Sequence, residues 1–551
     1  MSRRQRRQRN SISARSGWLR SDWLRGEQKP TSTAAEELVI AQEIAAAKAA
    51  KALAANPPKP GSRGWSGPGG GGVHYLQAPV EWRGTTVQVC GLWPFSAGSG
   101  SPMVGVPLGR NMLTGGTLCC DPISWFQRAN LISNPSAFVL GLPGLGKSSM
   151  VRRMALGLAG FGVNPMIFGD LKPDYVDLIG EMGGQVIELG RGRGSINVLD
   201  PGEAYEAADR LTGAARQQVL ADAHGRKLTM VGALITILRA EPPTDREETI
   251  IDRALKILDE THHGVPVLGD LLKIIQDAPE DLRHVALDRG DINRYRDITE
   301  GLEATLIGLT SGGRLGNIFS EQTTMPMKRD RPVVFDISSI DDSESDLQAA
   351  VMLACWSYGF GAINVAHALA DAGLEPQRNY FVVLDELWRA IRAGRGMVDR
   401  VDALTRLNRQ RGVGMAMISH TMADLMALPD DHDRMKARGF VERAGMVLCG
   451  GLPQSEMPRL NEAVMMSAAE EQMLIGWSAP PSWDPQSGRE AEPPGRGKFL
   501  VKVGGRPGIP FQVTLTQVER AVNDTNKRWH SALDPVVKRT DGTSLHRTQA
   551  L

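Results

Sequence analysis

Short apolar runs alternate with helical stretches along the central part of the chain. The runs predict seven β-strands, at 137–140, 165–168, 185–189, 332–337, 380–384, 413–418 and 444–449. Strands that are apolar at nearly every position are typical of a parallel sheet with both faces covered. The pattern therefore predicts an α/β fold, with a mainly parallel sheet and helices on both faces.

Between 203 and 320 the strand pattern is absent, and apolar residues recur at helical spacing on one face: Ile250, Ile251, Ala254, Leu255 and Leu258. We expect an all-helical insertion here, which divides the α/β core into a first part, 118–202, and a second part, 321–525. The second part ends with 498–503 and 509–516, which flank a Gly-Arg-Pro-Gly turn and predict a β-hairpin.

The segments outside this core differ from it in composition. Residues 1–72 contain a basic tail, an alanine-rich helix predicted at 33–55, and a linker rich in proline and glycine. Short β-like runs at 73–117 predict a small N-terminal β subdomain, and 526–551 form a polar tail.

The basic tail has eight arginines in its first 30 residues and repeats the triplet Trp-Leu-Arg at 18–20 and 23–25. Two interpretations stay open. Blocks of like charge are usually disordered and solvated. Interleaved tryptophan and arginine also suit a docking arm for an anionic membrane surface or for a partner protein.

The composition bears on possible partners and on the cellular compartment. The 551 residues carry 63 basic and 62 acidic side chains, so global charge makes no case for nucleic acid. The five cysteines form no CxxC motif, which favours a reducing compartment. Without an uninterrupted apolar run of about 18–20 residues or a signal peptide, we expect a cytoplasmic protein, at most peripheral to the inner face of a membrane.

The segment 141–148, Gly-Leu-Pro-Gly-Leu-Gly-Lys-Ser, satisfies the phosphate-loop pattern GxxxxGK[ST], between a predicted strand and a predicted helix at 148–159. Its glycines allow backbone N–H groups to surround phosphates, and the helix adds its positive dipole end. Lys147 is expected on the β and γ phosphates of ATP, and the Ser148 hydroxyl on Mg²⁺. The residues expected to bind the nucleotide are Gly141, Pro143, Gly144, Leu145, Gly146, Lys147, Ser148 and Ser149.

Two carboxylates, Asp385 and Glu386, directly follow the apolar strand 380–384. Asp385 is expected to hold Mg²⁺, and Glu386 to orient and deprotonate the attacking water. Acids at this place can also simply begin a helix. Asp336, which closes the strand 332–337 without a neighbouring glutamate, ranks second for the metal role.

A polar group follows the strand 413–418, at Ser419-His420-Thr421. Carboxyl ends of parallel strands line nucleotide crevices, so His420 is a candidate sensor of the γ-phosphate, or else part of a helix cap. Arg409, near Arg406 and Arg411, is a candidate to complete a neighbouring subunit's site, although arginines on a solvated helix face are common.

The set of motifs and their order along the chain resemble those of the HerA/FtsK superfamily, and within it those of the TraC-like ATPases of conjugation and type IV secretion. The resemblance covers roughly 105–520. It is carried by the phosphate loop, the acid pair and these segments: Pro107–Asn111, Asp121-Pro122, 169–175 (GDLKPDY), Gly183-Gly184 and 196–201 (INVLDP). It implies a RecA-like P-loop fold, ATP and Mg²⁺ as cofactors, and a homo-hexamer that works with other subunits of a secretion complex.

Three features depart from the family. Val198 stands where proline is usual, His420 stands where glutamine is usual, and we expect the family's large N-terminal docking domain to be missing or much reduced. The leading hypothesis is a motor or assembly ATPase of a conjugation-like type IV secretion apparatus. The alternatives are a DNA-translocating coupling protein of the same superfamily, and a nucleotide-binding structural module that does not hydrolyse.

Overall fold

The computed structural model describes residues 41–42, 44–45, 47–48, 102–315, 317–392, 397–405, 412–484, 489–490 and 492–522. The chain divides into two units, 1–96 and 97–551. In the first unit the described residues are helical and fall inside the helix predicted at 33–55. The arginine-rich tail, the Pro/Gly linker, Arg409 and the polar tail lie outside the described residues.

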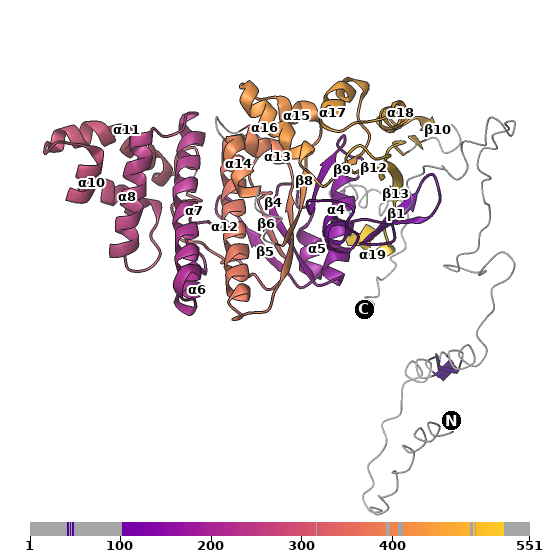
Figure 1. Ribbon diagram of the computed structural model, residues 1–551, viewed down its shortest axis with the longest axis horizontal. Coiled ribbons are helices and arrows are strands. Elements are labelled where there is room, and N and C mark those ends of the chain that lie inside the picture. The colour runs from indigo at the N-terminus through magenta and orange to yellow at the C-terminus, as the bar shows by residue number, and fades with distance from the viewer. Residues whose placement is uncertain are drawn as a thin grey trace, which may run out of the picture. The chain divides into compact units, whose positions relative to one another are not determined.

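The second unit is built around one large sheet (Figure 1). In chain order its strands are β1 Pro107–Asn111, β2 Thr117–Cys119, β3 Ser136–Leu140, β4 Val163–Asp170, β5 Gln185–Glu188, β6 Val333–Asp336, β7 Asn379–Leu384, β8 Val413–Ile418, β9 Met446–Cys449, β12 Lys498–Lys502 and β13 Ile509–Val513. The order across the sheet is β2-β1-β13-β12-β9-β3-β8-β7-β4-β6-β5.

The stretch from β9 to β5 pairs in parallel, whereas β12, β13, β1 and β2 are joined to it in antiparallel register. Each of the seven predicted core strands is present within two residues of its expected bounds. The predicted hairpin is β12–β13. A mainly parallel α/β sheet is therefore confirmed.

The β subdomain predicted at 73–117 differs from the structure in its described part, and 73–101 lie outside the described residues. Residues 107–119 form β1 and β2, which extend the main sheet instead of belonging to a separate subdomain, and β2 crosses the boundary expected at 117/118. The reason is long-range pairing, because β1 bonds to β13 from the far end of the chain, with Gly109 opposite Val513. A pattern read along the sequence carries no information about that partner.

Helices cover both faces of the sheet (Figure 1). α3 Pro122–Gln127, α4 Lys147–Gly160 and α5 Val176–Glu181 lie on one face, and α12 Ser345–Asp371, α13 Leu387–Ile391 and α14 Met397–Thr405 on the other. Successive strand residues point to opposite faces. In β3, Phe138 and Leu140 accordingly join the core beneath α12, while Ala137 and Val139 join the core beneath α4, and all four are fully buried.

The helix α12 is long and apolar enough to cross a membrane by length and composition, with a mean hydropathy of 1.4 in its best window. In this structure 89% of that window is buried inside the protein. Trp356 of α12 donates its indole N–H to the carbonyl of Phe168 in β4 at 2.6 Å, which fixes the helix to the sheet.

Six helices occupy the described part of 203–320, with no strand among them: α6 Ala204–Arg210, α7 Gly213–Arg239, α8 Asp245–Thr261, α9 Leu268–Asp277, α10 Glu280–Ala286 and α11 Ile292–Thr310. The long α7 packs beside α12 (Figure 1). α8 begins at a capping box of Thr244 and Glu247 and buries the predicted stripe from Ile250 to Leu258.

The remaining elements all follow β8 along the chain. They are α15 Met422–Met426, α16 Asp431–Glu442, η1 Gln454–Glu456, α17 Met457–Ala463, α18 Ala468–Trp477, the two-stranded pair β10 Trp483–Asp484 and β11 Arg489–Glu490, and α19 Gln517–Val522. Through α19 the chain returns to the side of α4, where Glu519 pairs with Arg153.

Candidate nucleotide site

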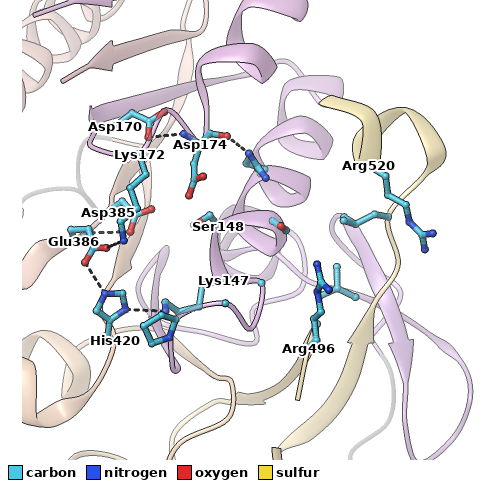
Figure 2. Close-up of a pocket in the computed structure, with 18 of the residues that line it drawn as sticks. Lys147, Ser148, Asp170, Lys172, Asp174, Asp385, Glu386, His420, Arg496 and Arg520 are labelled. Carbon is cyan, nitrogen blue, oxygen red and sulfur yellow. Dashed lines mark hydrogen bonds and ion pairs between the residues drawn. The ribbon is translucent and has the colours of Figure 1, made fainter. Parts of the chain in front are cut away.

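A cleft of about 880 Å³ opens where β3, β4, β7 and β8 end. In the sheet, β8 lies between β3 and β7, so the phosphate loop after β3 and the acid pair after β7 are two strands apart. The residue that follows β8 by two positions, His420, falls between them (Figure 2). Lys147 and Asp385, which are 238 positions apart in sequence, therefore line the same cavity.

The backbone conformation of the phosphate loop depends on glycine. Gly144 and Gly146 adopt φ values of 78° and 93°, which only glycine adopts without strain. The N–H of Gly141 donates to the carbonyl of His420 at 2.9 Å, and α4 starts at Lys147. The expected residues that line the cleft are Pro143, Gly144, Gly146, Lys147, Ser148 and Ser149.

Gly141 and Leu145 lie behind this wall. Leu145 is buried and turned into the protein, and Gly141 contributes its carbonyl oxygen instead of a cleft surface. That oxygen accepts a hydrogen bond from Lys147 Nζ at 2.6 Å, and the Leu142 carbonyl accepts a second at 3.3 Å. Burial lowers the pKa of Lys147 to about 8, although the negative charges of Asp385 and Glu386 act in the opposite direction.

The two acids differ in environment. Asp385 accepts hydrogen bonds from the Tyr175 hydroxyl at 3.2 Å and from the Glu386 backbone N–H at 2.9 Å. Burial and the neighbouring Glu386 carboxylate raise the pKa of Asp385 to about 6. Burial and the Glu386 charge disfavour the charged form of Asp385, and a divalent cation bound beside it would favour that form.

Glu386 is surrounded by donors. Lys172 Nζ lies 2.9 Å from its Oε1, while the Trp388 indole N–H and His420 Nε2 lie 2.6 and 3.2 Å from its Oε2. Burial would raise the pKa of Glu386, but His420 and Lys172 outweigh it and hold the pKa well below its ordinary value. Its φ of 50° is strained for a residue with a Cβ, at a cost of about 1 kcal/mol or more.

His420 bridges the two halves of the site. Its Nδ1 lies 3.0 Å from Lys147 Nζ, and its Nε2 lies 3.2 Å from Glu386 (Figure 2). One neutral tautomer satisfies both contacts, with Nδ1 accepting from the lysine and Nε2–H donating to the carboxylate. Its neighbour Thr421 is the N-cap of α15, so the helix-cap interpretation of this segment applies to Thr421.

Four residues of the segment 169–175, for which the sequence predicted no individual role, also surround the acid pair: Asp170, Lys172, Asp174 and Tyr175. Asp170 closes β4 and accepts the backbone N–H groups of Asp174 and Tyr175 at 3.0 and 2.6 Å, which shapes the loop that carries Lys172. Burial raises the pKa of Asp170 to about 7. The available signal was a strand ending in Gly-Asp, the same pattern of strand followed by acid that marked Asp385.

Asp336, which ranked second for the metal, lies outside the cleft lining. It ends β6, one strand beyond β4, and its carboxylate accepts the backbone N–H of Ser338 at 3.0 Å. The oxygen-bearing side chains that line the cleft near the phosphate loop include the Ser148 hydroxyl and the carboxylates of Asp385, Asp170 and Asp174. Oxygen donors of this kind fit Mg²⁺, which takes one or two protein ligands together with phosphates and water.

Solved structures share this architecture. The structure of VirB4 of Thermoanaerobacter pseudethanolicus matches with a TM-score of 0.55 and 18% identity, over 77% of this chain and 99% of that one. The chain has the fold of VirB4. The match to VirB4 confirms the predicted P-loop type of sheet.

Weaker matches accompany the one to VirB4. Plasmid coupling protein TrwB in complex with the ATP analogue ADPNP matches with a TM-score of 0.44 and 13% identity, over 71% of this chain and 87% of that one. TrwB in complex with ADP and Mg²⁺ matches with a TM-score of 0.43 and 13% identity, over 70% and 85%. No protein-family model and no curated protein sequence matches this chain.

Proposed function

We propose that this protein is an ATP-hydrolysing motor or assembly ATPase of a conjugation-like type IV secretion apparatus. The observation that carries the ATPase proposal is the meeting of Lys147, Ser148, Asp385 and Glu386 in one cleft. The secretion setting is supported by the ordered motifs that resemble TraC-like ATPases and by the VirB4 fold.

In the proposed reaction each side chain has one task. Lys147 exchanges its two carbonyl partners for phosphate oxygens, and the loop N–H groups hold the remaining phosphates. Ser148 and Asp385 would hold Mg²⁺, which supplies positive charge against the phosphates. Glu386 accepts a proton from the attacking water once a donor leaves its carboxylate, because three donors now occupy it.

Steady-state hydrolysis of Mg·ATP tests the proposal. We expect Glu386→Gln to lower the rate by about 100-fold or more, while ATP affinity changes less than about threefold, because the amide keeps the shape but accepts no proton. Asp336→Asn is the matched control, since it removes a strand-end carboxylate outside the cleft. Equal rates for Glu386→Gln and wild type would reject Glu386 as the base.

A ring of six copies is part of the proposal, because the resembled family works as hexamers. Arg409 is the proposed arginine that completes a neighbour's site. We expect Arg409→Ala to reduce hydrolysis in the assembled ring with little change in ATP affinity. The mass of the assembly and its hydrolysis rate are measured together, with and without single-stranded and duplex DNA. This also separates an assembly motor from a DNA pump, because DNA should stimulate the hydrolysis rate of a pump.

A further inference from the structure

The cleft extends beyond the space that the phosphates need. On the side of Ser148 away from Glu386, its wall is formed by the C-terminal part of the chain, and Arg496 and Arg520 are labelled there in Figure 2. The same wall includes Gln512, Val513 and Leu515. The phosphate loop and acid pair fix the γ-phosphate end of a bound triphosphate, so the nucleoside has to lie toward this opposite wall.

The wall is anchored to the phosphate loop. The backbone N–H of Gly497 donates to the carbonyl of Leu145 at 2.8 Å, and the side-chain amide of Gln512 donates to the carbonyl of Arg496 at 3.1 Å. Gly497 has a φ of 71°, and a Cβ there would lie 2.8 Å from the Gln512 amide nitrogen. The segment that carries Arg496 is therefore held in register with the loop that binds phosphates.

A second anchor fixes α19. Glu519 receives both bonds of Arg153 Nη1, at 2.8 and 2.6 Å, and the backbone N–H of Thr516 at 2.7 Å. Arg153 belongs to α4, the helix that follows the phosphate loop. Because Glu519 is fixed to α4, the adjacent Arg520 is kept at the cleft.

The two guanidinium groups are available for a ligand. Arg520 is exposed and its side chain makes no hydrogen bond or ion pair with the described residues. Arg496 has one loose partner, Glu492, at 3.5 Å, and both of these side chains are more than half exposed. The described residues of this wall include no aromatic ring, so arginine planes beside Val513 and Leu515 are the surfaces on which a base can stack.

We infer that Arg496 and Arg520 form the nucleoside subsite of this cleft and bind the base and ribose of the nucleotide, not its phosphates. The inference rests on the proposed function, since it assumes a nucleotide at Lys147. A planar guanidinium over a nucleobase resembles the cation–π and stacking contacts made with aromatic side chains. The subsite then distinguishes a nucleoside triphosphate from inorganic tripolyphosphate.

The test compares binding of Mg·ATP and Mg·tripolyphosphate by titration calorimetry. For the double variant Arg496→Ala/Arg520→Ala we expect ATP to bind about tenfold or more weakly, while tripolyphosphate binds within about twofold of wild type. Arg506→Ala is the matched control, because Arg506 is an exposed arginine in the turn before β13, outside the cleft. Arg496→Lys/Arg520→Lys keeps both charges but removes the planes, so it should behave like the alanine pair.

Three results would overturn the inference: equal weakening of both ligands, no weakening of either, or full ATP affinity in the lysine pair. Lys147→Ala separates these outcomes from a failure of the proposed function. If Lys147→Ala leaves binding of both ligands unchanged, the phosphate assignment itself is wrong. If it weakens both while the arginine variants weaken neither, only the nucleoside subsite is rejected.

Discussion

The affinity for ATP should fall as pH rises above about 8, because Lys147 must be protonated to bind phosphate. Burial lowers the pKa of Lys147 to about 8, compared with the ordinary lysine value of 10.5. Bound phosphates replace the lost solvation and restore the higher pKa, so binding takes up a proton when the pH exceeds the pKa of the free protein.

The size of the fall in ATP affinity follows from the linkage between proton binding and ATP binding. If only the protonated form binds, the apparent dissociation constant is multiplied by one plus ten raised to the power of pH minus pKa. With a pKa of about 8, the factor is close to 1 at about pH 7 and about 11 at about pH 9. Phosphate ionisation, with a second pKa of about 6, is nearly complete over this interval and adds little.

Titration calorimetry of Mg·ATP binding between about pH 7 and 9 measures this effect, with proton uptake read from buffers of different ionisation enthalpy. Lys147→Met is the control, and its weaker residual binding should not vary with pH in this way. Wild-type affinity that stays constant from about pH 7 to 9, or a decline of the same size in Lys147→Met, would refute the argument that this lysine carries the titration.

Three further predictions concern other parts of the account. Asp385, with a pKa raised to about 6, is protonated at lower pH, so Mg²⁺ affinity in the presence of ADP should fall about tenfold from about pH 7 to 5, and Asp385→Asn should bind weakly throughout. His420→Ala removes hydrogen bonds to two charged groups and should slow hydrolysis about 10–100-fold, whereas His420→Gln keeps one donor and one acceptor and should retain more activity; equal rates for the two variants would contradict the bridging role. Leu255→Ala in α8 should lower the free energy of unfolding by about 2–4 kcal/mol in urea while ATP affinity is unchanged, and joint loss of both would show that the insertion shapes the cleft.

The core strands were predictable because both faces of the sheet are buried. Runs such as 137–140 are apolar at every position, and the phosphate-loop motif begins where that strand ends. The helical insertion was equally visible, since the stripe from Ile250 to Leu258 needs only local periodicity. The joining of β1 to β13 was not predictable, because it depends on a partner about 400 positions away in sequence.

In the site, the motifs located Lys147, Ser148, Asp385 and Glu386, which do meet in the cleft. Lys172 was missed because an ion pair with a carboxylate 214 positions away leaves no local pattern. The arginines of the opposite wall were missed for the same reason. Arg496 and Arg520 lie in short segments whose arrangement is set by contacts with Leu145 and Arg153.

The central claim is that Lys147 and the acid pair act on one nucleotide, and the identity of the nucleotide retained by each variant tests it most directly. Proteins incubated with Mg²⁺ and radiolabelled ATP are separated from free ligand, and the bound label is resolved into ATP and ADP. We predict mostly ADP on wild type, mostly unhydrolysed ATP on Glu386→Gln, and almost no label on Lys147→Ala. Retention of ADP by Glu386→Gln at the wild-type level, or of full label by Lys147→Ala, would contradict the account.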